Sequence, residues 1–110
     1  FNIESRILTI SGTGDMYSYT LENMAPWSDS MANIGSITIE SGVTSIGDLA
    51  FYSLTIVEYI EIPNTVTKIG NYAFYGIDLI STINIQSSVI SIGSGAFDDC
   101  EMLSYRIDVL

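Results

Sequence analysis

The sequence lacks most of the side chains that ordinary enzyme and metal chemistry uses. It contains no histidine, and its one cysteine is Cys100. Histidine is the usual general base and zinc ligand, so its absence excludes Ser-His and Cys-His nucleophile pairs. A single cysteine forms neither an internal disulfide nor a cysteine metal cluster. We therefore expect no metal, no cofactor and no enzymatic activity.

Positive charge is also scarce. Thirteen acidic residues stand against Arg6, Lys68 and Arg106, which gives a formal net charge of −10. Such a surface repels phosphate backbones and anionic lipid headgroups, so we expect no nucleic-acid partner. No apolar run reaches the roughly 18 residues that a membrane span needs, so we expect no membrane insertion in this segment.

The composition is nevertheless that of a folded domain. Apolar residues make up 47% of the chain and charged residues 15%, which is typical of a sequence that buries a core. The chain starts at Phe1 without an initiator methionine or a signal-peptide pattern, and we expect the natural chain to begin upstream.

The most informative feature is an internal repeat. The segments "GSITIESGVTSIGDLAFYSL", "EYIEIPNTVTKIGNYAFYGI" and "STINIQSSVISIGSGAFDDC" align without a gap, and the step from Ile46 to Ile69 equals the step from Ile69 to Ile92. The columns that recur are Ile37/Ile60/Ile83, Val43/Val66/Val89, Ile46/Ile69/Ile92, Gly47/Gly70/Gly93, Ala50/Ala73/Ala96 and Phe51/Phe74/Phe97. A fixed period of this length indicates stacked structural repeats.

Each unit changes its own periodicity along its length. The pieces "ITI", "IEI" and "INI" alternate apolar and polar residues, as a half-buried strand does. A polar turn, a second short β segment and a glycine follow, and then a compact turn, expected to be helical, that carries the Ala and Phe columns. One such coil cannot bury its apolar residues alone, so the pattern predicts a repeat solenoid with a continuous core.

The unit "IEIPNTVTKIGNYAFYGIDLIST" resembles the BspA-like (Treponema pallidum type) leucine-rich repeat, whose pattern is IxIPxxVxxIGxxAFxxCxxLxx. The resemblance implies a right-handed leucine-rich-repeat coil that is β-rich, with short parallel strands and short helical turns. Two features depart from the pattern. The proline is present only as Pro63, and the cysteine only as Cys100, in a column shared with Leu54 and Ile77. Those apolar neighbours favour a small core residue over a reactive thiol.

The repeat predicts a division of the chain into three parts. Residues 1–33 are expected to form an N-terminal cap, in which Phe1–Ile3 and Leu8–Ile10 make a hairpin and an aromatic-rich loop places Trp27 over the open end of the first coil. Residues 34–103 form three 23-residue repeats. Residues 104–110 form a divergent or truncated repeat, and we expect the chain to belong to a longer array.

Two stretches resemble small-molecule or ion sites. "KIGNYAFYG", residues 68–76, combines glycines with a lysine, but the motif recurs in every unit, whereas a phosphate loop occurs once before a helix. A structural corner with an exposed Lys68 is favoured. Asp98, Asp99 and Glu101 suggest calcium, but their spacing matches no calcium loop. A hydrated turn is favoured there.

A better candidate site is the concave face of the predicted strands. The side chains that point outward in adjacent rows are Ser36, Thr38, Glu40, Tyr59, Glu61, Thr82, Asn84 and Gln86, with Pro63 beside them. Solenoids bind macromolecules on such extended surfaces. Tyr59 is the expected anchor, because rigid aromatic side chains dominate interface hot spots. Glu61 is expected to set the charge preference.

The sequence therefore predicts a non-enzymatic module that binds protein on its strand face. The resemblance implies a secreted or cell-surface protein and ligands such as the host matrix proteins fibronectin and fibrinogen, or other cell-surface proteins. Two alternatives remain open. The repeats could be a spacer or stalk that presents another domain, or the coils could belong to a β-helix that cleaves polysaccharides. The Ala-Phe columns argue against the β-helix.

Overall fold

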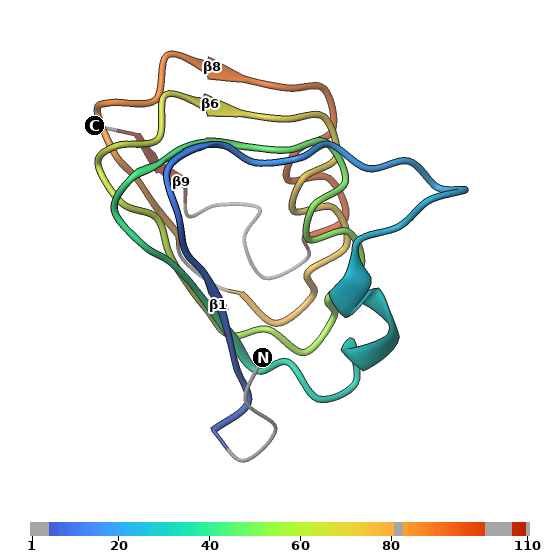
Figure 1. The fold of residues 1–110 in the computed structure, drawn as a ribbon. Helices are drawn as coiled ribbons and strands as arrows, with labels where there is room; N and C mark the ends of the chain where they lie inside the picture. The colour runs from blue at the N-terminus through green and yellow to red at the C-terminus, as the bar shows by residue number, and fades with distance from the viewer. Residues whose placement is uncertain (1–4, 81–82, 101–106, 110) are drawn as a thin grey trace.

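The chain winds into successive coils that stack one on another, as Figure 1 shows in a view along the stack. This computed structural model describes residues 5–80, 83–100 and 107–109. The elements are β1 (Ile7–Ile10), β2 (Gly14–Asp15), the 3-10 helix η1 (Pro26–Ser30), β3 (Ser36–Ile39), β4 (Val43–Ile46), β5 (Tyr59–Glu61), β6 (Lys68–Ile69), β7 (Ile83–Ile85), β8 (Ser91–Ile92) and β9 (Ile107–Val109).

Strands of the same kind pair in parallel from coil to coil. One sheet has the order β1-β3-β5, a second has the order β2-β4-β6-β8, and β7 pairs with β9. Ser36 pairs with Tyr59, and Ser45 pairs with Lys68, so neighbouring coils are offset by one sequence repeat. The repeat-solenoid prediction is confirmed.

The N-terminal segment forms a coil of its own. β1 pairs with β3 in parallel, and Ile7 lies opposite Ser36. The predicted hairpin partner, Phe1–Ile3, lies outside the described residues, while Leu8 and Ile10 belong to this parallel pairing. The offset from Ile7 to Ser36 is longer than the offset from Ser36 to Tyr59. Tyr19 bonds Asp48 at the longer offset and Trp27 bonds Ala50 at the repeat offset, so the extra residues of the first coil lie between Tyr19 and Trp27.

The core consists of columns of side chains at the repeat spacing. Ile37 on β3 and Ile60 on β5 are paired across the first sheet, and both are buried. The columns Ile34/Val57/Ile80 and Ile39/Ile62/Ile85, which the sequence analysis did not single out, are also buried. Each side chain covers the equivalent side chain of the next coil, so the core is continuous along the stack.

Aromatic rings form the largest column. Phe51 stacks on Phe74 and Phe74 stacks on Phe97, each with 5.4 Å between ring centroids. Trp27 stacks on the other side of Phe51 at 5.7 Å, and its indole Nε1–H donates to the Ala50 carbonyl at 2.7 Å. Tyr19 packs edge-on against Trp27. Trp27 thus extends the phenylalanine column to the first coil.

The corner after each glycine is a series of turns, and it does not form the helical turn expected from the sequence; η1 is the one helix among the described residues. The N–H groups of Leu49, Phe51 and Ser53 donate to carbonyls of the next coil at 2.7–3.0 Å, and not to carbonyls of their own coil. Leu49 and Ser53 have positive φ angles, whereas Phe51 between them does not. Backbone hydrogen bonding therefore runs between coils even where no strand is present.

The glycine column is required by close contact between coils. A Cβ atom added at Gly70 would lie 2.6 Å from the backbone nitrogen of Asp48 and 2.8 Å from the carbonyl carbon of Gly47. Gly47 and Gly93 meet the preceding coil in the same way. Beside this contact the Asp48 carboxylate accepts a hydrogen bond from the Asn71 N–H at 2.8 Å. In the next coil the Asn71 side-chain oxygen accepts a hydrogen bond from the Ser94 N–H, also at 2.8 Å.

Removal of the central ring of the column should destabilise the fold strongly. We expect Phe74→Ala to lower the free energy of unfolding by about 3–5 kcal/mol, because the ring is fully buried between two others. Phe97→Ala should cost less, because Phe97 is only partly buried. Urea unfolding followed by the fluorescence of Trp27, the single tryptophan, measures both. Equal losses for the two variants would contradict this packing.

A methyl group at the corner glycine should be poorly tolerated. We expect Gly70→Ala to lower the free energy of unfolding by about 1–3 kcal/mol, because backbone atoms of the preceding coil must move. Gly35→Ala is the matched control, because its Cβ would lie 3.7 Å from the Arg6 Cβ, an ordinary contact. Its effect should stay within about 0.5 kcal/mol. The same urea experiment distinguishes the two.

Candidate binding surface

The outward side chains of β1, β3, β5 and β7 form one continuous surface, called here the strand face. Ser36 and Tyr59 are direct neighbours across β3 and β5, and so are Thr38 and Glu61. In each of these strands the intervening isoleucine points into the core, because side chains alternate along a strand. The structure therefore brings the predicted residues of β3 and β5 together in two rows.

Exposure differs among the predicted site residues. Glu40, Glu61 and Asn84 are exposed, and Tyr59 exposes 58% of its surface. Ser36 and Thr38 are half-buried between their neighbours. Thr82 lies outside the described residues. Tyr59 is thus a large aromatic side chain that stands free on the face, as an interface anchor requires.

Gln86 has a structural role that the sequence did not indicate. Its side-chain Nε2 donates to the Ile62 carbonyl of the preceding coil at 3.2 Å, and the side chain is half-buried. In the preceding repeat this position holds Pro63, which has no side-chain donor. Gln86 therefore holds two coils together where β5 and β7 pass each other.

Two shallow depressions lie on the strand face. The larger, of about 570 Å³, has walls that include Thr38, Glu40, Glu61, Pro63 and Gln86. The smaller, of about 250 Å³, lies along β5 and β7 and includes Tyr59, Glu61, Asn84 and Gln86. Glu61 borders both depressions. The face is therefore uneven and acidic, and it is suited to a broad contact with another macromolecule.

The face has one strand more than the repeat predicts, and this is its first strand. β1 adds Ile7 beside Ser36 and Thr9 beside Thr38. Ile7 is 37% exposed and Thr9 is exposed. The alternation in "RILTI" carried the signal, but the longer offset of β1 from β3 hides it from an alignment at the repeat spacing.

The two small sites considered from sequence are structural. In "KIGNYAFYG", Ile69, Ala73 and Phe74 are buried, and Gly70 touches the preceding coil. Lys68 is exposed, as expected, and it lies near Asp15. Hydrogen bonds from Thr44 and Ser45 lower the pKa of Asp15, and the charge of Lys68 adds to this effect.

The turn that contains Asp98 and Asp99 also contacts the preceding coil. The Asp99 carboxylate accepts a hydrogen bond from the Tyr75 hydroxyl at 2.8 Å, and this bond raises the pKa of Tyr75. Tyr75 in turn stacks on Tyr52 with 5.0 Å between ring centroids. Glu101 lies outside the described residues. Among the residues that are described, no group of three or more potential ligands could hold a metal ion.

Cys100 lies in the core, as its column predicts. It is 5% exposed, and its thiol donates to the Phe74 carbonyl at 3.1 Å. Burial raises the pKa of the thiol. Since the folded state holds its proton more tightly than the unfolded chain, stability should fall as the pH rises through this pKa.

The stacked coils, the parallel sheets and the columns of Ile, Val, Ala and Phe define a leucine-rich-repeat solenoid. The family model described as "BspA type Leucine rich repeat region (6 copies)" matches residues 28–107. The chain belongs to this family.

Two solved bacterial structures resemble the chain. A leucine-rich cell surface protein of Faecalibacterium prausnitzii A2-165 is 33% identical, with a TM-score of 0.64, over 70% of this chain and 20% of that one. A leucine-rich repeat protein of Eubacterium ventriosum ATCC 27560 is 26% identical, with a TM-score of 0.65, over 96% of this chain and 40% of that one.

The chain spans between a fifth and two fifths of the length of these two structures. A comparison with curated protein sequences found no match. Within residues 5–80, 83–100 and 107–109, no helix has the length and apolarity needed to cross a membrane.

The buried thiol gives a test of the packing around Cys100. We expect iodoacetamide at pH 8 to modify the folded chain slowly, because the thiol is shielded and stays protonated, and urea should accelerate the reaction by orders of magnitude. Mass spectrometry measures the rate. A Cys100→Ala, Ser91→Cys chain is the matched control, because position 91 is exposed. Equal rates for the two folded chains would show that Cys100 is not part of the core.

Proposed function

We propose that the chain is a non-enzymatic binding module of a secreted or cell-surface protein and that it recognises a protein ligand on its strand face. The class of ligand proposed is a host extracellular matrix protein, such as fibronectin or fibrinogen, or another cell-surface protein. The observation that carries the proposal is the exposed Tyr59, which lies among polar side chains on a parallel sheet.

Inward and outward strand positions differ in how their residues change from coil to coil, and this difference supports the proposed function. Columns that point inward stay apolar from coil to coil, as with Ile37 and Ile60. Outward positions at the same register change, so that Ser36 is followed by Tyr59 and Thr38 by Glu61. The core between β3 and β5 is built from the inward side chains. The outward ones are therefore available to define a surface for one particular ligand.

The family and its solved relatives support the location. The F. prausnitzii structure is described as a leucine-rich cell surface protein. A net charge of −10 keeps a module soluble and favours ligands that carry positive charge. Two acidic side chains of the strand face carry part of this charge: Glu61 lines one depression with Tyr59 and a second depression with Glu40.

A structural spacer that presents another domain is the alternative function. It uses the same core but makes no use of the strand face. The chain spans only part of the length of its solved relatives. Binding experiments on the chain itself distinguish this alternative from the binding module.

A triple substitution tests the strand face. We expect Tyr59→Ala, Glu61→Ala and Asn84→Ala together to weaken binding to immobilised fibronectin or fibrinogen by about tenfold or more, because hot-spot side chains supply most interface energy. Surface plasmon resonance measures the affinity. The matched control replaces an exposed tyrosine, glutamate and asparagine away from the two depressions, Tyr17, Glu22 and Asn64.

The control variant should bind as the parent chain does. Unchanged binding in the strand-face variant would contradict the proposal. A folded parent chain that binds none of a panel of matrix and cell-surface proteins would favour the spacer.

A further inference from the structure

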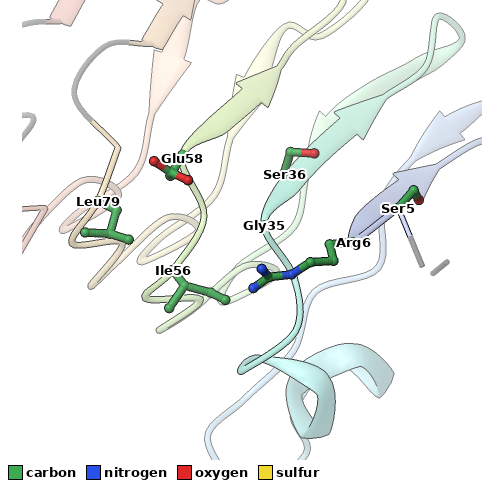
Figure 2. A pocket seen from close by; sticks show the side chains of 7 residues that line it. All are labelled: Ser5, Arg6, Gly35, Ser36, Ile56, Glu58 and Leu79. Carbon is green, nitrogen blue, oxygen red and sulfur yellow. The ribbon is translucent and has the colours of Figure 1, made fainter. Parts of the chain in front are cut away.

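A recess lies beside the strand face, where β1, β3 and β5 begin. Figure 2 shows its lining, which is contributed by successive coils. It has a volume of about 470 Å³ and is lined by Ser5, Arg6, Gly35, Ser36, Ile56, Glu58 and Leu79. No motif in the sequence drew attention to these residues.

The strand register places two opposite charges on either side of a glycine. Ile7, Ser36 and Tyr59 are aligned across the sheet, so Arg6, Gly35 and Glu58 directly precede an aligned row. Adjacent strands lie about 4.8 Å apart, and the backbones at Arg6 and Glu58 are therefore roughly 10 Å apart. Because Gly35 has no side chain, the space between the two charges remains open.

The Arg6 side chain is held in place by the protein. Its Nε donates to the Asn33 carbonyl at 3.2 Å, and its own carbonyl accepts from the N–H groups of Gly35 and Ser36. In Figure 2 the side chain extends from the start of β1 past Gly35 toward Ile56. This arrangement fixes one edge of the guanidinium and leaves its two terminal nitrogens for a ligand.

Neither charge is neutralised within the part of the chain that the structure describes. No ion pair there involves Arg6 or Glu58, and the Glu58 carboxylate receives no hydrogen bond. Ile56 and Leu79 provide apolar contact between and beside the charged groups, and Leu79 is 47% exposed. The recess thus presents a cation, an anion and an apolar wall to solvent.

The charge of the whole chain limits what can bind here. With a net charge of −10, the protein repels a simple anion before it reaches Arg6. A simple cation would find Glu58 but would leave Arg6 without a partner. A ligand that carries both charges satisfies both groups, and its positive charge is attracted by the surrounding field.

We propose that this recess binds an extended segment of the partner protein in which an acidic and a basic side chain are separated by one residue. The acidic side chain pairs with Arg6 and the basic side chain with Glu58. Side chains two positions apart on an extended segment lie on the same face, about 7 Å apart, and the long Arg and Glu side chains span the remaining distance. This inference rests on the proposed function, since it adds a second contact to the ligand of the strand face.

Capped peptides that carry one or both charges test the inference. The probes are Ac-Gly-Glu-Gly-Lys-Gly-NH2 and the two peptides in which Glu or Lys is replaced by Gln. Titration of the full chain at low salt is followed through the backbone amide NMR signals of Gly35 and Ser36. We expect saturable shifts with the doubly charged peptide, with a Kd on the order of 1 mM. Loss of either peptide charge should weaken binding about two- to fivefold, as for an exposed ion pair.

Substitutions in the chain identify the groups that bind the peptide. Arg6→Gln should weaken binding of the doubly charged peptide by the same factor, and Lys68→Gln, which changes the net charge equally on another sheet, should not. Glu58→Gln is a second variant on a different coil, and it avoids any loss of the Arg6–Asn33 hydrogen bond. The amide spectrum of each variant reports that it is folded.

The outcomes separate this inference from the proposed function. Three results would overturn the proposal that the recess binds a doubly charged segment. They are equal shifts with all three peptides, unchanged binding in the Arg6→Gln and Glu58→Gln variants, and no shifts at all. The triple strand-face variant leaves Arg6 and Glu58 in place. If it loses the matrix protein but still binds the peptide, both proposals stand. If no protein ligand binds the parent chain and the peptide still does, the proposed function fails and the recess remains a site for a peptide that carries both charges.

Discussion

The rest of the structure depends on the constraint that each coil must place its backbone and side chains in register with the next. A coil of this length satisfies only part of its own hydrogen bonding, since the N–H groups of Leu49, Phe51 and Ser53 all donate to the following coil. The rings of Phe51 and Phe74 likewise cover each other. An insertion within a repeat would break both sets of contacts, and so the spacing is kept constant across the repeats.

The same constraint explains why equivalent residues differ in burial. Ile69 lies between two coils and is 1% exposed, whereas Ile92, at the same position of β8, is 43% exposed. Their sequence environments are nearly the same. The difference arises because a residue in a solenoid is buried chiefly by the coils on either side of it, so its position in the stack determines its exposure.

The register also separates the positions that form the core from the positions that form the surface. Inward positions stay apolar because each must pack on its equivalent in the next coil, while most outward positions carry no such requirement. As a result Tyr59 can differ from Ser36 without disturbing the columns beneath them. The strand face and the recess beside it are built from these outward positions. Of two adjacent residues, Glu58 lines the recess and Tyr59 lies on the strand face. A ligand that contacts both surfaces would follow the sheet from its first strand onward.

The sequence by itself determined the repeat, the strands of each unit, the core columns and the outward rows of β3 and β5, because periodicity states which residues share an environment. It also determined that Cys100 is buried, through its apolar column. Only the tertiary structure decided that β1 joins the sheet and that the corners are turns without helix. Only the structure, too, placed Arg6 beside Gly35 and Glu58. The physical reason is that these features depend on contacts between coils. The first coil is longer than the repeat, so an alignment at the repeat spacing does not place Arg6 next to Gly35.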